Sequence, residues 1–393
     1  MKQVILGLDR LLTDPEAYLR GKTFGLVVNQ TSQTSDGYPS IPRFYSLGRF
    51  QLTTLFAPEH GLYGVNQDMA AVADHVDSTS GLPVKSLYGT DSSSLTPSSD
   101  LLRGLDNLIF DIQDVGSRYY TFIYTLANCM QVCARTDTHM VVCDRPNPIN
   151  GVTVEGNLVG GKYRSFVGQY PLPNRHGMTV GELANLYNNH FKIGCDLTVI
   201  PMQGWERTMW YDQTGLPWVA PSPNMPTLST ATVYPGMCLI EGTLLSEGRG
   251  TTLPFEQVGA PYIQAETLTK TLNAENLPGL FFRPHYFKPQ FQKWSGEICG
   301  GVQLHVKDRD VFKPFLTGIA VLCSIKKLHP GDFSWRTEPY EFVSDRPAID
   351  LLYGNPALRE GMESGSISLP DLEASWNGET EEFLQKREEY LIY

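Results

Sequence analysis

The chain has 393 residues, of which 41% are hydrophobic and 19% are charged, and its net charge is −11. This length is sufficient for a large buried core and indicates two domains. The acidic balance, without any block of Lys and Arg, argues against nucleic acid as a partner. No apolar run reaches the ~20 residues that a bilayer-spanning helix needs, so we expect no membrane span.

The first residues, MKQVILGLDRLL, lack the long apolar segment of a secretory signal because Asp9 and Arg10 interrupt it. We therefore expect a cytoplasmic protein, or a mature form whose leader has been removed. The seven cysteines are scattered among apolar residues, which favours buried free thiols over a disulfide framework. Cys129 and Cys133 lie four residues apart without a second pair, so we expect neither a metal ion nor another cofactor.

Apolar runs alternate with helical patterns in the first half of the chain. The predicted strands cover residues 23–31, 52–60, 107–116, 139–148 and 196–202. The predicted helices cover residues 41–50, 120–134 and 179–191, and Thr179 and Glu182 form a capping box in the last of them. Near-continuous apolar strands separated by helices predict an α/β, doubly wound domain with a mainly parallel sheet, which we place at residues 1–205.

The second half is less regular and is expected to form a smaller α+β domain over residues 206–393. Residues 231–251 are rich in Gly and Thr, and residues 296–308 have the pattern of a strand. Helical patterns cover residues 310–329 and 380–393.

Polar side chains follow the predicted strands of the first domain at the points where these strands end. Ligands of open parallel sheets bind outside this edge. The residues are Asn29 after the first strand, Glu59 and His60 after the second, Asp111, Gln113 and Asp114 after the third, and Asp144 and Arg145 after the fourth. Each one alone also fits a structural role, since an Asp after a strand is commonly a cap or turn residue.

Glu59 is harder to explain by a structural role. It follows the apolar run LTTLFAP of residues 52–58 directly, where little water is expected. Desolvation favours the protonated form of a carboxyl group, which suits a general acid.

A second polar cluster lies in EGTLLSEGRGTTLPFE, residues 241–256, and contains Glu247 and Arg249. Its glycines permit tight turns or the close approach of a ligand. The segment could be a hairpin with exposed charges, or it could face the first domain across a cleft that binds the ligand. The motifs of dinucleotide binding, P-loop phosphate binding, zinc proteases and serine hydrolases are absent from the sequence, which leaves carboxylate chemistry.

Seven sequence blocks together resemble the exo-β-N-acetylmuramidase family called NamZ, in order from about residue 20 to the C-terminus. The blocks are APEHGLYG, FDIQDVGSRYYTFIYTL, DRPNPINGVTVEGN, YPLPNRHGMTVGELA, SPNMPTLSTATVYPG, EGTLLSEGRGTTLPFE and CGGVQLHVKD. The resemblance implies a Rossmann-like first domain, a smaller second domain and a cleft between them. It also implies hydrolysis of terminal β-linked N-acetylmuramic acid from the non-reducing ends of peptidoglycan fragments, so that the partner is a muramyl-terminated glycan.

The resemblance also suggests roles for individual residues. The glutamate of its PEHG block, the leading catalytic candidate, matches Glu59, with His60 beside it, and Glu247 and Arg249 match its SEGRGT block. We favour Glu59 as general acid/base, with His60 and Glu247 as further catalytic candidates. The substrate-binding candidates are Asn29, Asp111, Gln113, Asp114, Arg118, Tyr119, Asp144, Arg145 and Arg249.

The sequence leaves the second catalytic group undecided and is compatible with two alternative functions. The second catalytic carboxyl could be Asp111, Asp114, Asp144 or Glu247, or the acetamido group of the substrate could replace it. A non-catalytic glycan-binding protein on the same fold is one alternative. A metal-dependent hydrolase is another, and it would use His60, Asp68, Asp74 and His75.

Overall fold

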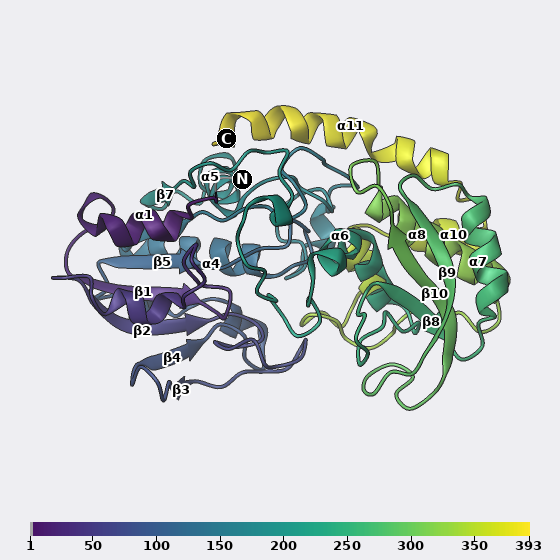
Figure 1. Ribbon diagram of the computed structural model, residues 1–393, viewed down its shortest axis with the longest axis horizontal. Helices are drawn as coiled ribbons and strands as arrows, with labels where there is room; N and C mark the ends of the chain where they lie inside the picture. The colour runs from purple at the N-terminus through teal and green to yellow at the C-terminus, as the bar shows by residue number, and fades with distance from the viewer. Residues whose placement is uncertain (1–2) are drawn as a thin grey trace.

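A seven-stranded sheet forms the centre of the first half of the protein, as the computed structural model of residues 3–393 shows (Figure 1). Its strands are β1 (Thr23–Val28), β2 (Gln51–Ala57), β3 (His75–Val76), β4 (Pro83–Ser86), β5 (Asn107–Asp111), β6 (His139–Cys143) and β7 (Leu197–Ile200). Their order is β3-β4-β2-β1-β5-β6-β7, and every neighbouring pair is parallel except β3 and β4. The predicted parallel sheet is therefore confirmed, with a short antiparallel strand at one edge.

The sheet is buried on both faces, as the apolar strands predict. Along β1, Val27 faces one hydrophobic cluster, whereas Leu26 and Val28 face the other. One cluster includes residues of α4 (Phe122–Thr136) and α5 (Val180–Asn185), and the other includes residues of α1 (Gly7–Thr13) and α2 (Ser40–Phe44). A further short helix, α3 (Ser99–Leu102), precedes β5. The first half is therefore doubly wound.

Two local predictions for the first half are also confirmed. Thr179 and Glu182 form the reciprocal capping box of α5, in which the Glu182 N–H donates to Thr179 Oγ1 at 3.2 Å and the Thr179 N–H donates to Glu182 Oε2 at 2.9 Å. The seven cysteines are all free, and only Cys323 is more than slightly exposed.

The second half combines a three-stranded antiparallel sheet with helices, which confirms the predicted α+β domain. The strands are β8 (Gln257–Ala260), β9 (Leu280–Phe287) and β10 (Cys299–Val306), in the order β8-β10-β9. The helices are α6 (Leu228–Met237), α7 (Ala265–Ala274), α8 (Pro314–Leu328), α9 (Ala348–Tyr353), α10 (Ala357–Ser364) and α11 (Leu369–Arg387). The sequence did not predict α6, and α11 begins before the predicted residue 380.

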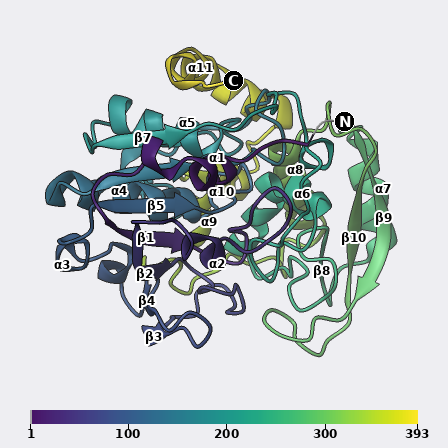
Figure 2. The same ribbon diagram turned by 60° about the vertical axis from the view of Figure 1, so that its left-hand side comes forward.

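The helix α11 connects the two halves by running from the second half back across the first (Figures 1 and 2). At its end, Arg387 donates hydrogen bonds to the carbonyls of Gly177 at 2.9 Å and Val152 at 3.0 Å. The hydroxyl of the last residue, Tyr393, donates to Asp144 Oδ2 at 2.7 Å. These contacts hold the C-terminus against the first domain.

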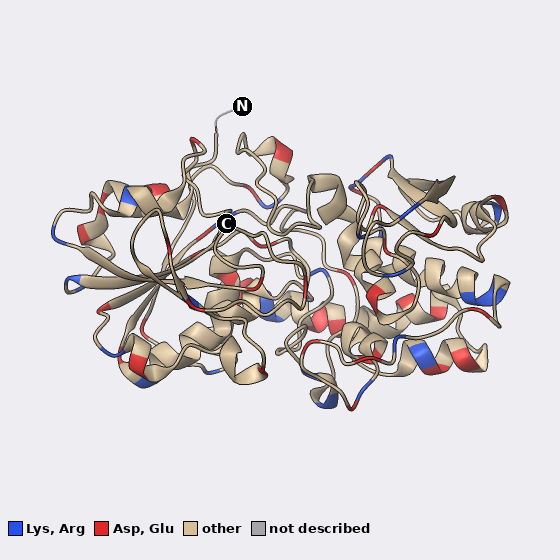
Figure 3. Cartoon of the chain, turned by 90° about the horizontal axis from the view of Figure 1, so that it is seen from below, with Lys and Arg blue, Asp and Glu red and all other residues tan. Residues whose placement is uncertain are grey.

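Lys and Arg positions are spread over both halves, and several acidic positions lie where the halves meet (Figure 3). None of the helices in residues 3–393 combines the length and the apolar character needed to cross a membrane.

Candidate active site

Glu59 lies just beyond the C-terminal end of β2, in a tight turn that the sequence PEHG makes possible. His60 and Gly61 both have left-handed backbone conformations, with φ of 70° and 77°, and the Gly61 N–H donates to the Pro58 carbonyl at 3.0 Å. Glycine adopts this conformation without strain, whereas His60 does so at some cost. The turn holds the Glu59 side chain in the protein, where it is 5% exposed.

Both carboxyl oxygens of Glu59 accept hydrogen bonds. The Thr121 hydroxyl donates to Oε2 at 2.7 Å, and the Met69 N–H donates to Oε1 at 3.3 Å. Thr121 is the N-cap residue of α4, and Met69 belongs to the loop that follows β2. Two separate segments therefore fix the orientation of this carboxyl group.

Residues from both halves of the chain line the pocket around Glu59, which agrees with the expected cleft between two domains. Its polar lining consists of Glu59, His60, Asp68, Thr121, Ser222, Glu241, Arg249 and Glu341. Its apolar and aromatic lining consists of Tyr119, Tyr120, Val167, Met225, Tyr234, Phe255 and Tyr340. The pocket encloses about 40 Å³, which is enough for a few water molecules.

Arg249 is the cationic residue of this lining, and three carboxylates surround it. Its guanidinium nitrogens lie 2.6 Å from Glu241, 3.0 Å from Asp68 and 3.3 Å from Glu247. These charges raise the pKa of Arg249 well above its ordinary value, against the opposing effect of burial. Glu247 also pairs with Lys293 at 2.9 Å and is not part of the pocket lining, so it positions Arg249 rather than facing the cavity.

His60 lines the same pocket, and its Nδ1 lies 2.9 Å from the Asn66 carbonyl. Tyr119 and Tyr120 also reach it, and the rings of Tyr120, Tyr234 and Phe255 pack edge to face. Of the residues predicted from the sequence, the structure thus brings Glu59, His60, Tyr119 and Arg249 together.

The strand-end residues Asp111, Asp144 and Arg145 lie outside this pocket, buried in the first domain. Arg145 binds both oxygens of Asp111, at 2.7 and 2.9 Å. Asp144 accepts hydrogen bonds from Thr179 and Tyr393, and burial raises its pKa to about 7. These side chains have internal partners that stabilise the ends of β5 and β6.

Arg118 also points away from the pocket. Its guanidinium donates to four main-chain carbonyls, those of Asn157, Leu172, Leu352 and Tyr353, at 2.6–3.1 Å. The carbonyls of Leu352 and Tyr353 belong to the C-terminal end of α9 in the second half, so Arg118 joins the two halves of the protein. Arg118 therefore does not line the pocket around Glu59, although it was a substrate-binding candidate.

The remaining predicted residues bind to nearby backbone. Asn29 accepts a hydrogen bond from the Thr31 N–H at 2.9 Å, and Gln113 donates to the Pro146 carbonyl at 2.7 Å. Asp114 accepts from the Gly116 N–H at 2.7 Å. These residues are buried at the edge of the sheet but do not line the pocket around Glu59.

The residues of the metal-dependent alternative are dispersed. Asp74 pairs with Lys85 at 2.8 Å, His75 is exposed, and Asp68 pairs with Arg249. Among residues 3–393, no three His, Cys, Asp or Glu side chains are arranged to hold a metal ion.

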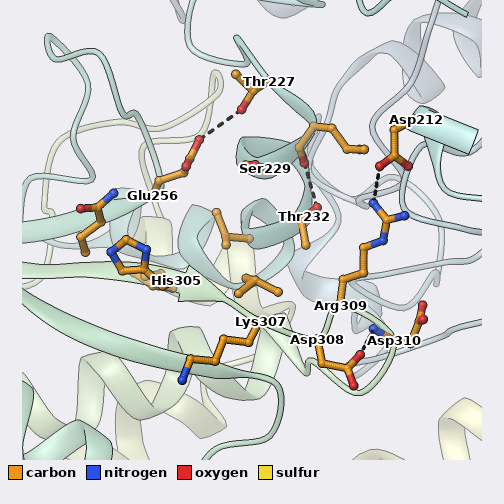
Figure 4. A pocket seen from close by; sticks show the side chains of 15 residues that line it. Asp212, Thr227, Ser229, Thr232, Glu256, His305, Lys307, Asp308, Arg309 and Asp310 are labelled. Carbon is orange, nitrogen blue, oxygen red and sulfur yellow. Dashed lines mark hydrogen bonds and ion pairs between the residues drawn. The ribbon is translucent and has the colours of Figure 1, made fainter.

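A larger pocket of about 740 Å³ lies between α6 and the end of β10 (Figure 4). Some of its polar side chains bind one another: Arg309 pairs with Asp212 at 2.8 Å, and Glu256 accepts a hydrogen bond from the Thr227 hydroxyl at 3.2 Å. None of the residues predicted from the sequence lines it. The pocket around Glu59 is therefore the better candidate, although it is smaller.

Several pocket residues were not predicted as site residues, above all Glu241 and Glu341. Glu241 falls in the recognised block around residue 247, which could have indicated it. Glu341 lies in TEPYEFVSD, residues 337–345, which contains no motif and follows no strand.

Comparisons with known proteins identify the family of this chain. The model of the exo-beta-N-acetylmuramidase NamZ N-terminal family matches residues 24–229, and that of the NamZ C-terminal family matches residues 232–393. The peptidoglycan beta-N-acetylmuramidase NamZ of Bacillus subtilis (strain 168) is 44% identical over 391 residues, which cover 100% of this chain and 92% of that protein.

Solved structures of two DUF1343 family proteins from Bacteroides fragilis have the same fold. One is 33% identical with a TM-score of 0.89, and the other is 30% identical with a TM-score of 0.78. Each comparison covers 100% of this chain and 99% of the other. The chain therefore belongs to the exo-beta-N-acetylmuramidase NamZ family.

Proposed function

We propose that this protein is a glycoside hydrolase that removes terminal β-linked N-acetylmuramic acid from the non-reducing ends of peptidoglycan fragments. The observation that carries the proposal is Glu59, a buried carboxyl group held by Thr121 and Met69 in a pocket that both halves of the chain line. Family membership and the activity of the Bacillus subtilis relative support it.

The composition of the pocket suits a sugar that carries a carboxylate. The rings of Tyr120, Tyr234 and Phe255 offer apolar surface against which a sugar can pack. N-acetylmuramic acid differs from N-acetylglucosamine by a lactyl ether with a carboxylate, and Arg249 is the pocket residue whose planar guanidinium can bind such a group. A substrate carboxylate would then compete with Asp68 for Arg249. Asp68 is the carboxylate partner of Arg249 that lies in a loop of the first domain.

Binding requires the pocket to open. Pockets that hold small molecules usually enclose ~300–1,000 Å³, whereas this one encloses about 40 Å³. Asp68 accepts a hydrogen bond from Gln292 of the second half at 2.7 Å, and Gln67 accepts one from Asn224 at 2.8 Å. The loop after β2 therefore closes the pocket through polar contacts that a substrate can replace.

Hydrolysis of two chromogenic glycosides tests the proposal. We expect the purified protein to release nitrophenol from a β-N-acetylmuramide and to cleave the corresponding β-N-acetylglucosaminide much more slowly. Binding of the muramide without turnover would instead favour a glycan-binding protein, and equal turnover of both sugars would refute the specificity.

A further inference from the structure

Glu341 is a second carboxyl group in the pocket of Glu59, and it comes from the other half of the chain. It is 6% exposed and lines the same cavity as Glu59. Glycosidases commonly act with two carboxyl groups on either side of the bond that breaks. A glycosidase mechanism at Glu59 therefore calls for a second carboxyl group in the same pocket.

The backbone around Glu341 is held in an unfavourable conformation. Tyr340 and Val343 exchange two backbone hydrogen bonds of 2.9 Å, which closes a two-residue turn. The two central residues, Glu341 and Phe342, have φ of 46° and 65°, and such turns normally carry Asn and Gly. Left-handed non-glycine residues are costly and concentrate at functional sites. The turn directs the carboxyl group of Glu341 into the pocket.

The other carboxyl groups near the pocket are already paired. Asp68, Glu241 and Glu247 all contact Arg249. Among residues 3–393, Glu341 has no ion pair, and its one hydrogen bond is from the Tyr88 hydroxyl to Oε2 at 3.0 Å. Its Oε1 is therefore free to meet a substrate.

The surroundings of Glu341 favour its protonated form. Glu59 accepts two hydrogen bonds, from Thr121 and Met69, whereas Glu341 accepts one, from Tyr88. Burial, and next the charge of Glu59, raise the pKa of Glu341 well above its ordinary value. Two carboxyl groups in one pocket are not easily ionised at the same time, because their negative charges repel each other. The charge of Glu59 therefore helps to keep the proton on Glu341.

We infer that Glu341, and not Glu59 as the sequence suggested, is the proton donor of the reaction, and that Glu59 acts beside it as the carboxylate. This assignment rests on the proposed function. As the bond between C1 and the glycosidic oxygen breaks, the Glu341 proton passes to the departing oxygen. A water molecule forms the new bond to C1 and gives its proton to Glu59, and transfer of that proton from Glu59 to Glu341 restores the initial state.

The assignment is tested with Glu341→Gln and two β-muramides that differ in the leaving group. A natural sugar leaving group needs protonation, whereas nitrophenolate hardly does. We expect a loss of ~10²–10⁴ in kcat/KM on the disaccharide, in the usual range for a general acid, and less than ~10-fold on the nitrophenyl glycoside. The basic limb of the pH profile should also disappear on the disaccharide.

A matched control is Glu338→Gln, which alters an exposed glutamate of the same loop and should leave both rates unchanged. Equal losses on both substrates, or no loss on either, would overturn the role of Glu341. If the wild-type protein cleaves neither muramide, the proposed function itself fails.

A second variant keeps the test decisive if Glu341→Gln does not fold. Tyr88→Phe removes the hydrogen bond that lowers the pKa of Glu341, while Glu59, Glu241 and Asp68, the charged groups that raise it, stay in place. The basic limb for the disaccharide should therefore move to higher pH. An unchanged or lower limb in this variant would contradict the assignment.

Discussion

Replacement of Glu59 by Gln separates the chemical role of this residue from its structural role. The amide keeps one acceptor oxygen for either Thr121 or Met69, and the Thr121 hydroxyl can rotate to accept from the new NH₂ group. The structural cost is then about one hydrogen bond, or ~0.5–1.5 kcal/mol. We expect the melting temperature to fall by no more than ~2 °C in a protein of this size.

The loss of activity should be much larger. Loss of a proton-transfer group typically costs ~10²–10⁴ in rate, which corresponds to ~3–5 kcal/mol in the activation free energy. Because Glu59 acts as the carboxylate, both the muramyl disaccharide and the nitrophenyl muramide should be affected. Steady-state kinetics and thermal unfolding on the same sample measure both effects.

The matched control for this variant is Glu256→Gln. Glu256 also accepts a threonine hydroxyl at 2.7 Å, from Thr230, but it lines the larger pocket. This variant should retain full activity. Turnover of Glu59→Gln near the wild-type value, with an intact fold, would refute the assignment of Glu59.

Three further predictions concern charge. Arg249→Ala should lower the ratio of kcat/KM for the muramide to kcat/KM for the glucosaminide by ~1.5–3 kcal/mol, the range of a charged hydrogen bond. Arg145→Ala, which breaks the buried pair with Asp111, should leave this ratio unchanged. An unchanged ratio in Arg249→Ala would show that the lactyl group is recognised elsewhere. Burial raises the pKa of Glu155 from 4.5 to about 7. Because the folded state therefore binds this proton more tightly than the unfolded state, the free energy of unfolding should fall by roughly 3 kcal/mol as the pH rises through that interval. Denaturant titrations at pH 5 and pH 8 should show a smaller fall in Glu155→Gln than in the wild type, and an identical fall would contradict this origin. EDTA should not alter muramide turnover, because the pocket carboxylates pair with Arg249 and tyrosine hydroxyls; loss of activity that zinc or manganese restores would support the metal-dependent alternative.

The sheet of the first domain could be predicted because its signal is local. Strands buried on both faces appear as short apolar runs, and the intervening helices have their own periodicity and caps. The helix α6 could not be predicted in this way, since it contains Pro235 and Gly236. It depends on a tertiary contact, because a Cβ atom at Gly236 would lie 1.7 Å from the Pro314 carbonyl oxygen of α8. Close packing against α8 thus outweighs the weak local preference for a helix.

The same distinction separates the site residues. Glu59 was predictable because its position follows from the strand directly before it in the sequence. Asp111 and Arg145 share that position, but the sequence cannot show that they bind each other at 2.7 Å rather than a ligand. Glu341 reaches the pocket only because the second half of the chain packs against the first. Neighbouring residues in the sequence therefore contain no signal for it.

The loop after β2 connects closure of the pocket with the geometry of Glu59. Two successive residues of this loop have different contacts: Asp68 binds Arg249 and Gln292 of the second half, and the Met69 N–H binds Glu59. Opening of this loop to admit a sugar, which the proposed function requires, would break the hydrogen bond from Met69 to Glu59. Closure over the bound sugar would form this hydrogen bond again and exclude water from the pocket. The orientation of Glu59 would therefore depend on contacts that both halves of the chain make with the same loop.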